Sequence, residues 1–146
     1  MLEKPITYKD PFTGESVTEK FYFNITPAET IDIEARYNGS IMSAIKRVQA
    51  SRNLESIIEI FKYIIGKAYG ERPLNTNKFI KSKEATDAFL SSDAYSELMF
   101  ELLEDKDAAA DFFAHVFPEK ETMIDRLKKL VGANGTSDEA SDAVVE

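Results

Sequence analysis

Residues 54–69 read LESIIEIFKYIIGKAY, and this stretch decides the fold. Its apolar residues recur at alternating steps of three and four, which is the period of one face of an α-helix. They are Leu54, Ile57, Ile58, Phe61, Ile64, Ile65 and Ala68. β-Branched side chains lower intrinsic helix propensity, but a period kept over so many residues outweighs that preference. The pattern predicts a central helix over 54–69, ended by Gly70, whose apolar face forms the core.

Two strand-like segments precede this helix. Residues 6–10 and 16–24 favour extended structure, and residues 10–14 between them read DPFTG, which is typical of a turn. The apolar residues of the second segment share one face by alternation: Val17, Phe21 and Phe23. Glu19 is out of place on that face. Because an isolated hairpin is marginal in water, its apolar face is expected to lie on helices of the same chain or on a partner.

Capping signals predict helices on both sides of the central one. Thr26, Pro27 and Glu29 combine a capping box with proline at the first helical position, which predicts a helix ending near Tyr37. Further helices are expected over 41–49, from Ser82 to Leu90, from Ser92, from Asp105, and around Met123 to Val131. The predicted fold class is mainly α with an N-terminal β-hairpin, that is, a helix-dominated, multi-helix α+β domain.

The 146 residues are enough for one core without disulfides. We expect a single globular domain over 1–131, with the hairpin at 6–24 and the helical body at 26–131. From 132 to 146 the composition changes to Gly, Asn, Ser, Thr, Ala and acidic residues without an aromatic, and this acidic tail is expected to be disordered.

Composition excludes several function classes. The formal net charge of -8 opposes binding to nucleic acid, whose phosphates attract Lys and Arg. The absence of cysteine excludes disulfides, thiolate metal sites and a cysteine nucleophile. Neither a signal peptide nor a membrane-spanning run is found, so a soluble cytoplasmic protein without membrane contact is expected.

No group of residues indicates catalysis, a metal site or a cofactor. The one histidine, His115, has Asp111 and Glu119 four residues away on either side, but no second ligand or nucleophile accompanies it. A partly exposed structural histidine fits better than a general base. Lys78, Lys81 and Lys83 are expected to pair with acidic helices rather than to bind single-stranded nucleic acid.

Two kinds of residue are candidates for binding a partner. Glu97, Glu101 and Glu104 gather on one helical segment, where a solvated face is favoured over a cation site and an acidic docking surface is the alternative. Tyr22, Ile60 and Tyr63 add apolar surface that could be offered to a client, although ordinary packing explains them as well. The candidate partner-binding surface is therefore Tyr22, Ile60, Tyr63, Glu97, Glu101 and Glu104.

Several short motifs follow one another in a definite order. They are ITY at 6–8, EKFYFNITPAE at 19–29, KAYGE at 67–71, Arg72, KFIK at 78–81, Ala88-Phe89, SDAYSEL at 92–98 and AAADFF at 108–113. In this order, from Ile6 to Pro118, the chain resembles the tail assembly chaperones of long-tailed, siphovirus-type bacteriophages.

The resemblance implies a non-catalytic protein that binds the tape measure protein and helps recruit tail tube subunits around it. Such a protein acts in the host cytoplasm and is absent from the mature virion. The resemblance also leaves room for a homo-oligomer and for a longer form made by ribosomal frameshifting. Two alternatives stay open: a structural tail component of the terminator or connector type, and an acidic inhibitor or regulatory protein.

Overall fold

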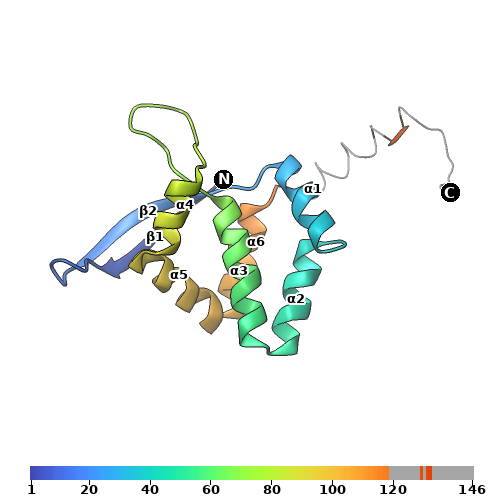
Figure 1. Ribbon diagram of the computed structural model, residues 1–146, viewed down its shortest axis with the longest axis horizontal. Helices are drawn as coiled ribbons and strands as arrows, with labels where there is room; N and C mark the ends of the chain where they lie inside the picture. The colour runs from blue at the N-terminus through green and yellow to red at the C-terminus, as the bar shows by residue number, and fades with distance from the viewer. Residues whose placement is uncertain (119–128, 130, 133–146) are drawn as a thin grey trace.

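An antiparallel hairpin opens the chain in the computed structural model, which describes residues 1–118, 129, 131 and 132 (Figure 1). β1 (Leu2–Lys9) pairs with β2 (Ser16–Phe23) along its whole length. A two-residue strand, β3 (Tyr69–Gly70), pairs with the end of β2 and completes a sheet of order β1-β2-β3. The predicted hairpin is confirmed, whereas β3 was not predicted.

β1 begins four residues earlier than predicted. The additional residues include Pro5, and proline usually argues against a strand. β1 lies at the edge of the sheet, with Pro5 opposite Lys20. Since proline carries no N–H, it fits an edge strand at a position whose missing donor points away from the neighbouring strand.

The helices confirm the predicted helix-dominated α+β class. In the described part of the chain they are α1 (Pro27–Arg36), α2 (Ile41–Ser51), α3 (Leu54–Ala68), α4 (Lys83–Leu90), α5 (Asp93–Glu104) and α6 (Lys106–Val116). The helix predicted around Met123 to Val131 and the tail from 132 fall almost entirely outside the described residues.

The helix ends follow the capping signals. The Thr26 Oγ1 accepts the Glu29 N–H at 3.1 Å, and the Glu29 carboxylate accepts the Thr26 N–H at 2.9 Å, so the capping box is confirmed. The predicted caps of α4, α5 and α6 are also confirmed. After α1, Asn38 and Gly39 adopt positive φ of 56° and 140°, which ends the helix near Tyr37 as expected.

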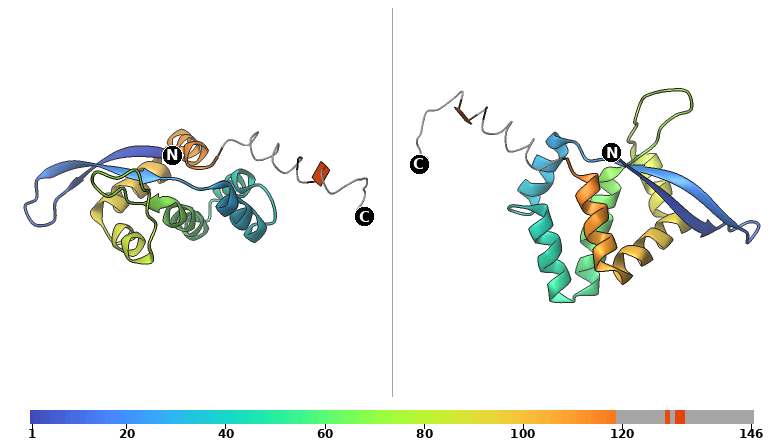
Figure 2. Two further views of the ribbon diagram at one scale, coloured as in Figure 1. Left: turned by 90° about the horizontal axis from the view of Figure 1, so that it is seen from above. Right: turned by 180° about the vertical axis from the view of Figure 1, so that it is seen from behind.

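α3 lies at the centre of the helices, beside α6 (Figures 1 and 2). The rings of Phe61 on α3 and Phe113 on α6 are 5.0 Å apart and both are fully buried. The buried residues of α3 are Ile60, Phe61, Ile64, Ile65 and Ala68, so the prediction of a core helix is confirmed.

The predicted membership of the buried face of α3 is wrong at three residues. Leu54 is 59% exposed and Ile58 37% exposed, while Ile60 is buried. The buried arc is centred near Ile64, so Ile60 lies inside it, Ile58 lies at its edge, and Leu54 belongs to the first turn. The helix also ends at Ala68, because Tyr69 is extended and pairs with Phe23 of β2.

The apolar face of the hairpin packs on helices of the same chain. The rings of Phe21 and Phe23 lie 5.2 Å and 5.7 Å from the ring of Phe89 on α4, and Ile6 on β1 is buried. Figure 2 shows the hairpin running along one side of α4 and α5, with its turn projecting beyond them. The hairpin is therefore a wall of the core, and its outer edge, β1, stays unpaired in the described chain.

Candidate functional site

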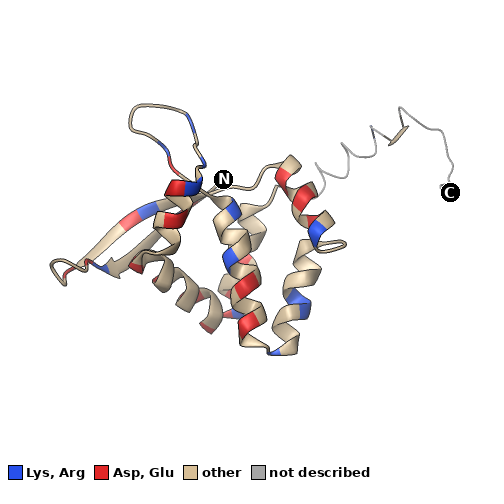
Figure 3. Ribbon diagram, in the orientation of Figure 1, with Lys and Arg blue, Asp and Glu red and all other residues tan. Residues whose placement is uncertain are grey.

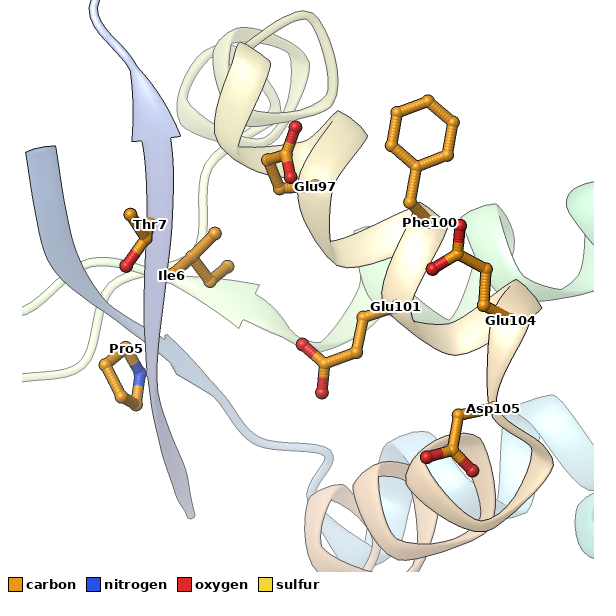
Figure 4. A pocket seen from close by; sticks show the side chains of 8 residues that line it. All are labelled: Pro5, Ile6, Thr7, Glu97, Phe100, Glu101, Glu104 and Asp105. Carbon is orange, nitrogen blue, oxygen red and sulfur yellow. The ribbon is translucent and has the colours of Figure 1, made fainter. Parts of the chain in front are cut away.

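A groove runs between the edge strand β1 and helix α5. Lys4 on β1 joins the two walls through an ion pair with Glu101 on α5, with Nζ and Oε2 2.7 Å apart. The groove encloses about 520 Å³, and its lining residues come from the strand, from the helix and from the junction after it: Pro5, Ile6, Thr7, Glu97, Phe100, Glu101, Glu104 and Asp105. Figure 4 shows Ile6 and Glu101 pointing toward one another across this space.

The sequence of α5 explains which side chains face the groove. Its buried side is formed by Ala94, Leu98, Met99 and Leu102. The helical period then places Glu97, Phe100, Glu101 and Glu104 on the outer side, where all four are exposed. Phe100 keeps 55% of its surface accessible, which is unusual for a phenylalanine in a folded helix.

The groove is strongly acidic. Helix α5 contains Asp93 and three glutamates but no Lys or Arg. Glu101 is neutralised by Lys4, and the carboxylate of Asp105 accepts the N–H groups of Asp107 and Ala108 as the cap of α6. Glu97 and Glu104 make no ion pair with any residue that the structure describes. Two carboxylates on this wall are therefore left to water.

The three glutamates of the predicted surface thus share one groove, but the apolar candidates lie elsewhere. Tyr22 is half-buried beside a separate hollow at the β2–β3 end of the sheet. Tyr63 packs on Tyr37, with the Arg36 guanidinium 4.5 Å from its ring centroid. Ile60 is 3% exposed and offers no surface to a partner in this conformation.

The other polar candidates have structural surroundings. The Nδ1 of His115 lies 2.7 Å from the carbonyl oxygen of Asp111 and 3.4 Å from its carboxylate, on the exposed side of α6. Within residues 1–118 and the three described residues beyond them, no group of three or more His, Cys, Asp or Glu could hold a metal ion. Lys81 pairs with Glu29 and Lys83 with Asp87, each at 2.7 Å, as predicted for these lysines.

The sequence did not indicate several exposed apolar residues, among them Phe100, Phe12 and Leu74. Phe100 stands in the sequence among apolar residues of α5 that are mostly buried. The sequence therefore does not distinguish it from a core residue. Phe12 is 96% exposed in the hairpin turn, and Leu74 is 91% exposed in the loop between β3 and α4. An apolar side chain within a turn or loop sequence could have indicated the latter two.

Comparison with known proteins places the chain in a family. A family model described as phage tail assembly chaperone matches residues 1–144. The chain belongs to this family. The resemblance found in the order of motifs is therefore confirmed, and the match extends beyond Pro118 to almost the whole chain. None of the curated proteins and none of the solved structures matches the sequence. The β1–α5 groove is thus a surface feature of a tail assembly chaperone. In the part of the chain that the structure describes, no helix is long and apolar enough to cross a membrane.

Proposed function

We propose that this tail assembly chaperone binds the tape measure protein in the host cytoplasm, keeps it soluble and assists the assembly of tail tube subunits around it. The observation that carries the proposal is the family match over residues 1–144. The chaperone acts by binding alone and leaves before the virion is complete.

The surface of the chain suits such a role. A chaperone needs apolar side chains that contact a client, and Phe12, Leu74 and Phe100 all expose more than half of their surface. A high net charge keeps a complex with an aggregation-prone client in solution, and this chain carries -8. Both properties are present in one small chain.

The polar residues support binding rather than catalysis. His115 is bonded to the carbonyl of its own helix, and Asp105 is occupied as a helix cap. The three tyrosines whose pKa is raised to about 12 stay protonated at neutral pH: Tyr8 through its hydrogen bond to Glu19, and Tyr69 and Tyr95 through burial. These three hydroxyls are therefore not poised to transfer a proton near pH 7.

The proposal is tested by expressing the tape measure protein of the same virus with and without this chain. We expect the chain to raise the soluble fraction of the tape measure protein severalfold and to co-purify with it. An unrelated acidic protein of similar size is the matched control for charge. An unchanged soluble fraction without co-purification would contradict the proposal, and recovery of the chain from purified virions would favour a structural tail component.

A further inference from the structure

We infer that the groove between β1 and α5 is the docking site for a positively charged, amphipathic helix of the client. The inference rests on the proposed function and adds where the client binds and what kind of segment it presents. It is carried by the shape of the groove, by its exposed aromatic ring and by its charge.

The strand wall of the groove favours a helix over an added β-strand. An edge strand can recruit another strand only through a row of free backbone N–H and C=O groups. In β1 this row is interrupted at Pro5, which has no N–H to offer. The other wall, α5, presents side chains and not backbone. An incoming helix needs only side-chain contacts, so this geometry suits it.

The aromatic ring supplies the apolar contact. Phe100 is 55% exposed and is flanked on the same face of α5 by Glu97 and Glu104. Figure 4 shows its ring directed away from the helix, with Glu97 and Glu104 as its neighbours on α5. An aromatic anchor with polar groups beside it is the usual arrangement of an interface whose central contact is apolar.

The negative charge of the groove favours an occupant of positive charge. Glu97 and Glu104 are exposed, and neither has a cation within the described chain. A helix carrying Lys or Arg on both sides of an apolar stripe can pair with both carboxylates while its apolar side chains cover Phe100. Nucleic acid and anionic lipid are repelled by the same charges.

A second copy of this chain is the competing occupant. Its α2 carries Lys46 and Arg47 without any acidic residue (Figure 3). Two copies with a charge of -8 each repel one another, however. A client of positive or neutral charge is not repelled in this way. The client is therefore the favoured occupant.

The first test compares paired substitutions in the full chain co-expressed with the tape measure protein. Glu97→Lys with Glu104→Lys reverses the two unpaired groove charges, and Asp32→Lys with Glu59→Lys makes the same charge change on exposed positions of α1 and α3. Phe100→Ala removes the anchor, and Ile31→Ala removes an apolar side chain of similar exposure, 49%, on α1. Glu101 is left unchanged because its ion pair with Lys4 joins the hairpin to α5.

We expect the two groove variants to retain the tape measure protein at least tenfold less than the wild type, and the two control variants to retain it as the wild type does. Thermal unfolding checks that all four variants fold, and Glu97→Gln with Glu104→Gln replaces the lysine variant if that one does not. Equal retention by groove and control variants overturns the docking site alone. A wild-type chain that retains no tape measure protein overturns the proposed function, and the docking site with it.

Two further readouts test the chemistry of the occupant. Overlapping peptides that span the tape measure protein are titrated against the labelled chain, and we expect binding by peptides of positive net charge with an apolar helical stripe. Their affinity falls steeply in about 1 M salt, where the screening length is about 3 Å. Binding confined to neutral or acidic peptides, or binding that salt does not change, overturns the inference. A change in the chain's own mass by light scattering in the groove variants, with client retention unchanged, assigns the groove to a second copy and also overturns it.

Discussion

The hydroxyl of Tyr8 on β1 donates a hydrogen bond to the carboxylate of Glu19 on β2, on the face of the hairpin that packs on the helices. Glu19 lies opposite Ile6, so its carboxylate is on the face that carries Phe21 and Phe23. The hydrogen bond explains how the face accommodates it. The same contact raises the pKa of Tyr8 to about 12.

Replacing Tyr8 with phenylalanine should lower the free energy of unfolding by about 0.5–1 kcal/mol, because this hydrogen bond is exposed to water and contributes at the lower end of the general range for protein hydrogen bonds. The pKa of Tyr8 is raised in the folded state, so this stability is fully present below about pH 10 and is lost as the pH rises through about 12. Urea unfolding of wild type and variant at neutral and alkaline pH measures the difference. A difference that stays constant across this range would contradict the assignment.

Much of the fold could be predicted because its signals are local. The capping box at Thr26, the caps Ser92 and Asp105, and the turn after Lys9 each depend on residues within one helical turn or one hairpin. β3 could not be predicted, since two residues carry no periodic pattern and Tyr69 is extended only because β2 is there to pair with it.

The candidate site could be predicted only in part. Helical spacing grouped Glu97, Glu101 and Glu104 correctly on one side of α5. The partner wall of the groove, however, depends on a contact between Lys4 and Glu101, which are 97 positions apart in the chain. No pattern in a single sequence indicates such a distant pair, so Phe100 and Pro5 could not be recognised as parts of one surface.

The centre of the core is predicted to be far more sensitive to truncation than the start of α3. Phe61 is fully buried against Phe113, and Phe61→Ala should cost about 3–5 kcal/mol through lost burial and the cavity left behind. Leu54 belongs to the same apolar repeat but is 59% exposed, so Leu54→Ala should change stability by no more than about 0.5 kcal/mol. Chemical denaturation of both variants checks the contrast. Similar losses would mean that the repeat, and not the observed burial, determines the core.

Glu29 connects the capping box of α1 to the segment before α4. Burial raises the pKa of its carboxyl, but the hydrogen bonds from Lys81 and from the Thr26 backbone outweigh that effect and lower it from 4.5. Glu29→Gln should therefore cost about 1 kcal/mol at neutral pH. Because the folded pKa is lowered, this stability is present above about pH 4.5 and is lost as the pH falls through the folded pKa.

Urea unfolding of wild type and Glu29→Gln between neutral and acidic pH measures this dependence, with Asp32→Asn as a control on the exposed side of the same helix. The difference between wild type and Glu29→Gln should shrink as the pH falls. If the difference in unfolding free energy did not change with pH, the loss in Glu29→Gln would come from the shape of the amide and not from the missing charge.

Gly70 is predicted to admit no side chain, because the ring of Phe79 lies against its Cα. A methyl group there would approach the Cε1 and Cε2 atoms of Phe79 to 2.8 Å. The ring cannot simply move away, since paired backbone hydrogen bonds of 2.8 Å between Glu71 and Ile80 hold the two ends of the loop together. Gly70→Ala should thus cost about 1–3 kcal/mol, the usual range for overpacking.

In a double-mutant cycle, adding Gly70→Ala to Phe79→Ala should cost much less than adding it to the wild type, because the obstructing ring is already gone. Additive losses in that cycle would place the strain in the backbone of β3 and not in the contact with Phe79.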